Sequence, residues 1–392
     1  MMRPPFVCEL PDVGQVTVRL RSQVINVLVG DRQPSYSFDL AGRLIGAYVG
    51  GRNYRRALDN RVLQKWPGPG KRRQRRWLSG EEARTLLTEA YELAGRAVAA
   101  TGEPRLGVLS GWKWQALEAD AARFAEVYRP VSILPPDQYL ALVLQVTEGC
   151  SHNRCTFCDF YRDRPFRINS PDELRAHIAA VRGFFGPALG LRKTLFLADA
   201  NALVAPMARL RAWFDVIQES KILPAAGIYS FLDAFDVQRK TEADWGELAS
   251  LGLRRVYIGM ETGDESLLRY LRKPGQAIDV VDAVSALKVA GISVSVIILT
   301  GIGGNRFAQA HVAGTVSALN AMPLGAGDIV YFSPFIDHQR SEYGRRAEED
   351  GIHPVSEAEI AAQEVAIRAG FRVRDPANPP RCSRYDIREF IY

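Results

Sequence analysis

The sequence predicts an α/β protein: a partial (βα)6 TIM-like barrel with a smaller N-terminal β/α accessory region and a short C-terminal extension. Two observations carry this prediction. Six short apolar runs recur between residues 141 and 333, and helical patterns separate each run from the next. Strands that alternate with helices form a parallel sheet, and right-handed crossovers curl such a sheet into a barrel.

The accessory region is expected to span residues 1–135. Alternating apolar and polar runs between residues 6 and 40 indicate a small β-rich unit. Ser79, followed three residues later by Glu82, forms a capping box that predicts the start of a helix, and a second helix is expected near residues 115–127. The Pro-Pro pair at residues 135–136 ends this region, because it interrupts regular structure.

The barrel core is expected to span residues 136–335, and residues 336–392 form the extension. The extension has a helix that begins at Ser356 and an apolar tail expected to dock as a strand or extended segment. The six expected barrel strands are residues 141–146, 194–198, 225–230, 254–259, 293–299 and 328–333. The helices between them are expected near residues 170–185, 205–219, 241–250, 264–290 in two pieces, and 305–321.

The composition narrows the class of protein. Hydrophobic residues make up 47% and charged residues 24%, which is typical of a folded protein and argues against disorder. No run reaches the roughly 18 apolar residues of a membrane-spanning helix, and the N-terminal residues lack an apolar signal core. Five cysteines, three of them clustered, suit a reducing compartment, so we expect a cytoplasmic protein without disulfides and without a membrane partner.

Positive charge is concentrated in residues 51–76, which hold ten Lys and Arg against Asp59 alone. The Pro and Gly residues at the centre of this basic stretch predict an exposed loop. Three readings stay open. The stretch is a solvated loop, a nucleic-acid contact in which Tyr54, Trp66 and Trp77 stack on bases, or a docking site for an acidic reductase or an anionic substrate.

Three cysteines form the strongest chemical signal. Cys150, Cys155 and Cys158 have the spacing C-x4-C-x2-C and follow the first expected barrel strand, at the strand end where such barrels place their chemistry. A structural zinc ion needs a fourth ligand, and His152 lies too close in the loop to serve without strain. A [4Fe-4S] cluster held by three cysteines keeps one iron open, so we favour a reactive cluster over structural zinc or an electron-transfer cluster.

Over roughly residues 140–335 the chain resembles the radical S-adenosylmethionine (SAM) superfamily. The family pattern is C-x3-C-x2-C with an aromatic residue before the last cysteine, a place that Phe157 fills here. The first gap, residues 151–154, is one residue longer than in the family, which should change the path of the loop and leave the three thiolates in place. The resemblance implies that the cysteines bind a [4Fe-4S] cluster whose open iron is chelated by SAM.

The resemblance also implies SAM contacts at the ends of further strands. Glu261 matches the position that accepts the ribose hydroxyls, and Gly301 lies in a stretch similar to the adenine contact. Ser230 ends the third strand, and Asp199 and Asn201 follow the second, where the family often carries a Gly-Gly-Glu-like segment. Phe160 and Tyr161 are expected to shield the cluster.

The function implied is that of a radical SAM enzyme. It would cleave SAM reductively to a 5′-deoxyadenosyl radical that abstracts hydrogen from an unknown substrate, with an electron donor such as flavodoxin or ferredoxin. Asp337, His338 and Tyr343, after the sixth strand, are candidates for the substrate side. The alternative is a non-enzymatic RNA-binding protein with a structural zinc or iron-sulfur site.

Overall fold

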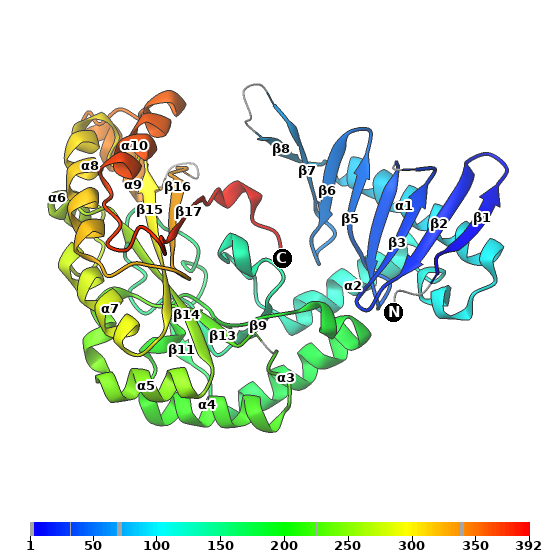
Figure 1. The fold of residues 1–392 in the computed structure, drawn as a ribbon, viewed down its shortest axis with the longest axis horizontal. Helices are drawn as coiled ribbons and strands as arrows, with labels where there is room; N and C mark the ends of the chain where they lie inside the picture. Colours follow the sequence, from blue (N-terminus) through cyan, green and yellow to red (C-terminus); the bar gives the residue numbers. More distant parts are fainter. Residues whose placement is uncertain (1–3, 32, 69–72, 225, 338–340) are drawn as a thin grey trace. The chain divides into compact units, whose positions relative to one another are not determined.

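The chain is described by a computed structural model that covers residues 4–31, 33–68, 73–224, 226–337 and 341–392 (Figure 1). Its contacts divide it into two compact units. The first, here called the N-terminal unit, comprises residues up to 131 together with 179–193 and 389–392. The second, called the barrel unit, comprises residues 132–178 and 194–388.

The N-terminal unit is built on one antiparallel sheet in which each strand pairs with the next along the chain. The strands are β1 (Phe6–Leu10), β2 (Gly14–Leu20), β3 (Val24–Val29), β4 (Ser35–Asp39), β5 (Leu44–Val49), β6 (Arg52–Arg56), β7 (Val62–Pro67) and β8 (Arg73–Trp77). Three helices follow them: α1 (Gly80–Thr101), η2 (Pro104–Leu109) and α2 (Trp114–Val127).

Helix α1 covers one face of this sheet (Figure 1). It begins at the predicted capping box, in which the side chains of Ser79 and Glu82 each accept a hydrogen bond from the other residue's amide. Its buried stripe, which includes Leu87, packs in one core with alternate strand residues such as Val27 and Phe38. Every third or fourth residue of the helix and every second residue of the strands are apolar, and these two faces pack against each other in one core.

The expectation of a loop in the basic stretch is wrong for most of its centre. Strands β7 and β8 pair as an antiparallel hairpin, with Lys65 opposite Arg75. Leu63 is buried, so β7 has an apolar face that fixes the strand, and Lys65 and Arg75 both pair with Glu389. Lys71 and Arg72 lie outside the described residues.

The barrel unit holds a parallel sheet in the order β17-β16-β15-β14-β13-β12-β9. Six of its strands match the expected ones: β9 (Leu142–Gln145), β12 (Leu195–Ala198), β13 (Ile228–Phe231), β14 (Leu253–Glu261), β15 (Ser293–Thr300) and β16 (Ile329–Pro334). The expected start of the third strand, Ala225, lies outside the described residues. The short strands β10 (Thr147–Glu148) and β11 (Arg167–Ile168) pair with each other.

The expected helices are confirmed, and a short one is added. The helices are α3 (Pro171–Phe185), α4 (Met207–Glu219), α5 (Glu242–Ser250), α6 (Glu265–Tyr270), α7 (Ala277–Val289), α8 (Gly304–Ala321), α9 (Glu342–Glu349) and α10 (Glu357–Gly370). The 3-10 turns are η3 (Pro136–Gln138), η4 (Gly186–Leu191), η5 (Ala202–Val204), η6 (Ala234–Arg239) and η7 (Ile387–Glu389). Helix α9 was not predicted from the sequence.

The C-terminal tail adds a seventh strand to the barrel sheet. β17 (Arg381–Arg384) pairs in parallel with β16, from Arg381 opposite Ile329 to Arg384 opposite Phe332. The tail therefore docks as a strand, as its apolar residues indicated, and Tyr385 and Ile387 after it line a cavity of the barrel unit.

A half-buried polar cluster joins β14 and β16 to the segment before β9. Asp137 precedes β9 and accepts hydrogen bonds from the hydroxyls of Tyr257 at 2.7 Å and Tyr331 at 2.8 Å, and from Arg255 at 2.9 Å. All three donors share the Asp137 carboxylate, which therefore ties β14 and β16 to the segment before β9.

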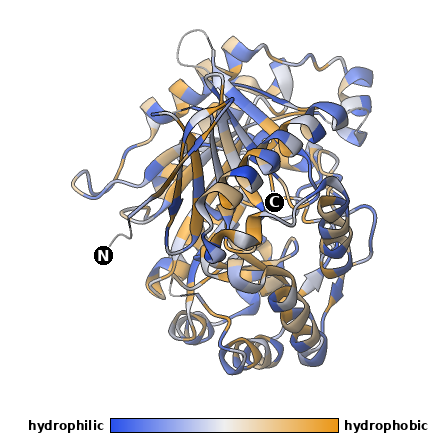
Figure 2. Cartoon of the chain, turned by 90° about the vertical axis from the view of Figure 1, so that its right-hand side faces the viewer, coloured by the Kyte–Doolittle hydropathy of each residue, from blue (hydrophilic) through white to orange (hydrophobic). Residues whose placement is uncertain are grey.

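Figure 2 shows hydrophobic residues along the strands and on one side of many helices, with hydrophilic residues on the other side. None of the described helices combines the length and the apolar character that crossing a membrane requires.

Candidate active site

The cysteine loop follows β10 at the C-terminal end of the barrel sheet. Gly149 precedes it with a φ of +75°, and an added Cβ would lie 2.9 Å from the carbonyl oxygen of Pro165, so only glycine fits. Asn153 also has a left-handed φ, of +48°, and donates a hydrogen bond from Nδ2 to the carbonyl of Tyr161 at 2.8 Å. The four-residue gap between Cys150 and Cys155 is thus turned at Asn153.

Two neighbours hold this loop in place. The buried carboxylate of Asp199 accepts hydrogen bonds from the amide of Gly149 at 3.0 Å and from Nε2 of Gln145 at 3.2 Å, and Nε of Arg164 lies 3.4 Å away. On the far side of the loop, the amide of Thr156 donates to the carbonyl of Leu271 at 2.9 Å. The loop is therefore tied to two different βα connections of the barrel.

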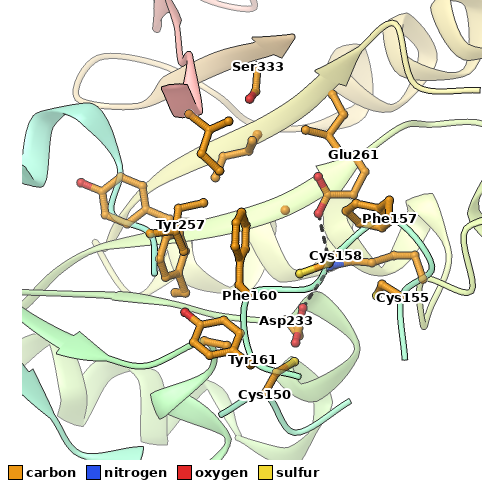
Figure 3. A pocket seen from close by; sticks show the side chains of 18 of the residues that line it. Cys150, Cys155, Phe157, Cys158, Phe160, Tyr161, Asp233, Tyr257, Glu261 and Ser333 are labelled. Atoms are coloured by element: carbon orange, nitrogen blue, oxygen red, sulfur yellow. Dashed lines mark hydrogen bonds and ion pairs between the residues drawn. The ribbon is translucent and has the colours of Figure 1, made fainter. Parts of the chain in front are cut away.

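The three cysteines line one cavity of about 200 Å³ (Figure 3). Phe157 and Glu261 line the same cavity, and so do Phe160 and Tyr161. Residues that are far apart in the sequence therefore meet at the end of the barrel where the strands terminate, as parallel βα folds place their sites. Most of the remaining lining is apolar.

A buried cation lies between two carboxylates at this cavity. Nζ of Lys273 is 3.1 Å from Oδ1 of Asp233 and 3.4 Å from Oε1 of Glu261, and only 13% of its side chain is exposed. Figure 3 shows both ion pairs as dashed lines. Desolvation lowers the pKa of Lys273, but the attraction of the two carboxylates is larger and holds this pKa well above its usual range. Burial raises the pKa of Glu261 despite this cation.

The cysteines are free thiols in a desolvated setting. Burial raises the pKa of Cys155 to about 12 and that of Cys158 to about 11, and it raises the pKa of Cys150 as well. Thiolates are stable at such a place only when a cationic centre binds them, which is what a metal cluster supplies.

The donor set fits an iron-sulfur cluster better than a single ion. Over the described ranges, no three His, Cys, Asp or Glu side chains converge on one metal position. A [4Fe-4S] cluster does not require such convergence, because each cysteine binds a different iron. Cys150, Cys155 and Cys158 are the residues that would hold it.

The other expected SAM contacts do not line the cavity. Asn201 is fully buried, and its Nδ2 donates to Oδ2 of Asp236 at 2.7 Å and to Oγ of Ser151 at 3.2 Å. The hydroxyl of Ser230, also fully buried, donates to the carbonyl of Leu197 at 3.0 Å. Asn201, like Asp199, thus supports the cysteine loop from outside the cavity, and Ser230 lies within the sheet.

Gly301 has a φ of +87° and contacts the C-terminal helix. Its amide donates to Oε1 of Gln363 at 2.8 Å, and an added Cβ would lie 2.9 Å from Cγ1 of Ile360. The glycine therefore allows α10 to approach β15 closely. Asp337 and Tyr343 do not line the cavity either, and His338 lies outside the described residues.

Sequence reasoning missed several lining residues. Lys273 lies near the end of residues 258–274, the stretch that resembles the family's ribose-binding segment, but only Glu261 and Gly263 were singled out there. Asp233 follows β13, and a charged residue just after a barrel strand was the available signal for it. Tyr385 and Ile387 come from the segment after β17. The sequence provided only a weak indication that these two residues line the cavity, namely the apolar character of the tail.

Comparison with known proteins adds an independent finding. The family model described as the radical SAM superfamily matches residues 144–310, a range that contains the three cysteines and Glu261. Residues 144–310 of this chain are therefore similar to the radical SAM superfamily. Radical SAM proteins are enzymes, and the family implies an iron-sulfur cluster, SAM and a source of electrons.

Solved structures with partial similarity to this chain were also found. Coproporphyrinogen III oxidase (HemN) from Escherichia coli is 15% identical with a TM-score of 0.44, over 64% of this chain and 55% of its own. Methylornithine synthase (PylB) is 15% identical, with a TM-score of 0.39 and coverages of 76% and 72%. The cobalamin-dependent enzyme OxsB is 14% identical, with a TM-score of 0.39 and coverages of 58% and 30%.

The chain thus spans about a third of OxsB and about half of HemN. A similarity of this size identifies neither a substrate nor a reaction. A comparison with curated proteins returned no match.

Proposed function

We propose that this protein is a radical SAM enzyme that binds one [4Fe-4S] cluster through Cys150, Cys155 and Cys158 and uses SAM to start a radical reaction on an organic substrate. The observation that carries the proposal is the convergence of the three thiols with Glu261 on one cavity. When bound, the cluster and SAM supply reductive cleavage of the sulfonium to a 5′-deoxyadenosyl radical, which removes a hydrogen atom from the substrate.

The chain's own residues would bind and orient SAM. Glu261 would accept hydrogen bonds from the ribose hydroxyls, as its position at the end of β14 and the family resemblance support. Nζ of Lys273 lies 3.1 Å from Asp233 and 3.4 Å from Glu261, so it would fix the orientation of both carboxylates toward the cavity. Phe157, Phe160 and Tyr161 line the cavity with aromatic rings that would exclude water and oxygen from the cluster.

Asp199, Asn201, Ser230 and Gly301 remain proposed SAM-site residues with indirect roles. Asp199 and Asn201 bind atoms of the cysteine loop or of the segment before it, so we propose that they set the loop's position. We propose that Ser230 acts by holding β13 to β12 through its hydrogen bond to Leu197, and that Gly301 acts by letting α10 pack against the end of β15.

Anaerobic reconstitution with iron and sulfide tests the proposal. We expect about four irons per chain and formation of 5′-deoxyadenosine and methionine when SAM and dithionite are added. Cys155→Ala should lose both properties. Cys8→Ala, which removes a thiol of the N-terminal sheet, is the matched control and should keep both. A wild-type protein that takes up no iron, or takes it up and leaves SAM intact, contradicts the proposal.

The proposal includes a cellular location and two kinds of partner. Five free thiols suit a reducing, cytoplasmic compartment. A small electron donor such as flavodoxin or ferredoxin would reduce the cluster. Nucleic acid is the other candidate, through the basic stretch. A salt-dependent shift of RNA that survives neutralisation of Arg72, Arg73, Arg75 and Arg76 together would contradict that role.

A further inference from the structure

The cavity has two chemically different sides. Its ionisable residues other than cysteine and tyrosine are His152, Asp159, Asp233, Glu261 and Lys273. All of them come from the cysteine loop, the end of β14 and the two connections beside it. This charged side also carries the three cysteines, and under the proposed function it holds the cluster and the methionine and ribose parts of SAM.

The other side has no ionisable group apart from tyrosine among the described lining residues. It is formed by β15, β16 and the segments at residues 133 and 385–387, and we call it the apolar wall. The wall consists mainly of Ile133, Ile297, Leu299, Phe335, Tyr385 and Ile387, with Ser333 among them. Its residues come from strands and from a docked segment, so the wall is a preformed surface.

The tyrosine hydroxyls next to this wall are already used. The hydroxyl of Tyr385 donates to the carbonyl of Leu134 at 2.8 Å, and that of Tyr257 donates to Asp137 at 2.7 Å. These residues therefore offer their rings to the cavity and not their polar ends.

Ser333 is the exception. It lines the cavity with 5% of its surface exposed, and no residue in the described part of the chain hydrogen-bonds its hydroxyl. Figure 3 shows its side chain on the edge of the cavity away from Cys150. A polar group in an otherwise apolar wall, without a protein partner, is placed to fix the orientation of a ligand.

We propose that the apolar wall binds the substrate, and that the substrate is an uncharged, mainly apolar organic molecule with one hydrogen-bonding group for Ser333. The inference rests on the proposed function, because the charged groups of SAM are taken to fill the charged side. An ionic group against the wall would lose its hydration without gaining a counterion, whereas an apolar skeleton is stabilised by the surface it buries.

Three probes of one skeleton test this: 2-naphthol, naphthalene and 2-naphthoate, each measured by equilibrium dialysis on the reconstituted protein with SAM. We expect saturable binding of 2-naphthol at one site per chain and at least about tenfold weaker binding of the anion 2-naphthoate. Equal or tighter binding of 2-naphthoate, or no binding of 2-naphthol, overturns the inference.

Variants locate the binding. Ser333→Ala should weaken 2-naphthol by about 2- to 10-fold and leave naphthalene unchanged, because only the hydrogen bond is lost. Leu299→Lys should abolish binding of both, while Val289→Lys, at a side chain that is 71% exposed on α7, should alter neither. If Ser333→Ala weakens both neutral probes equally, Ser333 does not orient the ligand.

The failures of the two proposals are distinguishable. SAM cleavage by the wild-type protein without 2-naphthol binding contradicts only the substrate inference. A protein that does not bind iron or cleave SAM contradicts the proposed function, and dialysis then still reports whether the wall binds neutral molecules.

Discussion

Replacement of Asp199 tests whether this residue acts by holding the cysteine loop. Its carboxylate is 3% exposed and accepts hydrogen bonds from Gly149 at 3.0 Å and from Gln145 at 3.2 Å, with Arg164 at 3.4 Å. In Asp199→Ala the amide next to Cys150 and the buried guanidinium both lose this acceptor. Burial raises the pKa of Asp199, and Arg164, the Gly149 amide and Gln145 oppose this shift by stabilising the charged carboxylate.

The size of the effect follows from these contacts. Hydrogen bonds to charged groups contribute about 1.5–3 kcal/mol each, and removing one partner of a buried ion pair costs about 3–5 kcal/mol. The contributions share one carboxylate and are not additive, so we expect the loop to be destabilised by roughly 3–5 kcal/mol. Asp199→Asn keeps an acceptor for the Gly149 amide and should show a smaller loss.

The assay is iron retention after anaerobic reconstitution, followed as the loss of cluster absorbance in the presence of a chelator. Asp199→Ala should lose its iron much faster than the wild-type protein, with Asp199→Asn between them. Asp172→Ala removes a carboxylate that is 91% exposed on α3 and should behave as wild type. If Asp199→Ala retains iron normally and only its affinity for SAM falls, Asp199 is a ligand contact and the reasoning is refuted.

Three further predictions concern other parts of the chain. Glu261→Gln should keep its iron and bind SAM about 10- to 100-fold more weakly, because a charged acceptor is lost; unchanged affinity by calorimetry would exclude the ribose role. Asp120→Ala should lower the free energy of unfolding of the N-terminal unit by about 3–5 kcal/mol, since Asp120 lies buried 2.8 Å from Arg43, and a loss below about 1 kcal/mol in chemical denaturation would contradict this. Gly301→Ala should lower the thermal midpoint, since its φ is +87° and its Cβ would lie 2.9 Å from α10, whereas Gly246→Ala, which has open space in α5, should not.

The barrel could be predicted from the sequence because its signals are local. Each of the six strands is a short apolar run, and helix starts such as Ser356 with Glu359 are marked by capping boxes. The cysteine motif is local as well, since its three thiols lie within nine residues. Such features depend on neighbours in the chain and are visible without the fold.

The remaining features depend on long-range pairing. The β7-β8 hairpin was not predicted because its sequence is dominated by Lys and Arg. The few apolar residues of β7 are recognised as a buried face only once the two strands are paired. The role of Lys273 depends on Asp233, 40 residues away in the sequence, and that of Asp199 on Gly149, 50 residues away. Neither partner is marked by a motif, so the sequence identified the ends of the strands but not the ion pairs between them.

Strand β17 also sets an order of events during protein synthesis. The cysteines at residues 150–158 leave the ribosome long before residues 381–387, which complete the apolar wall. Until β17 pairs with β16, the cavity lacks Tyr385 and Ile387, so its lining is complete only after the last part of the chain has been made. β17 is the edge strand and is held by a ladder of four residue pairs, so detaching this one strand would remove the same two residues from the cavity of the folded protein.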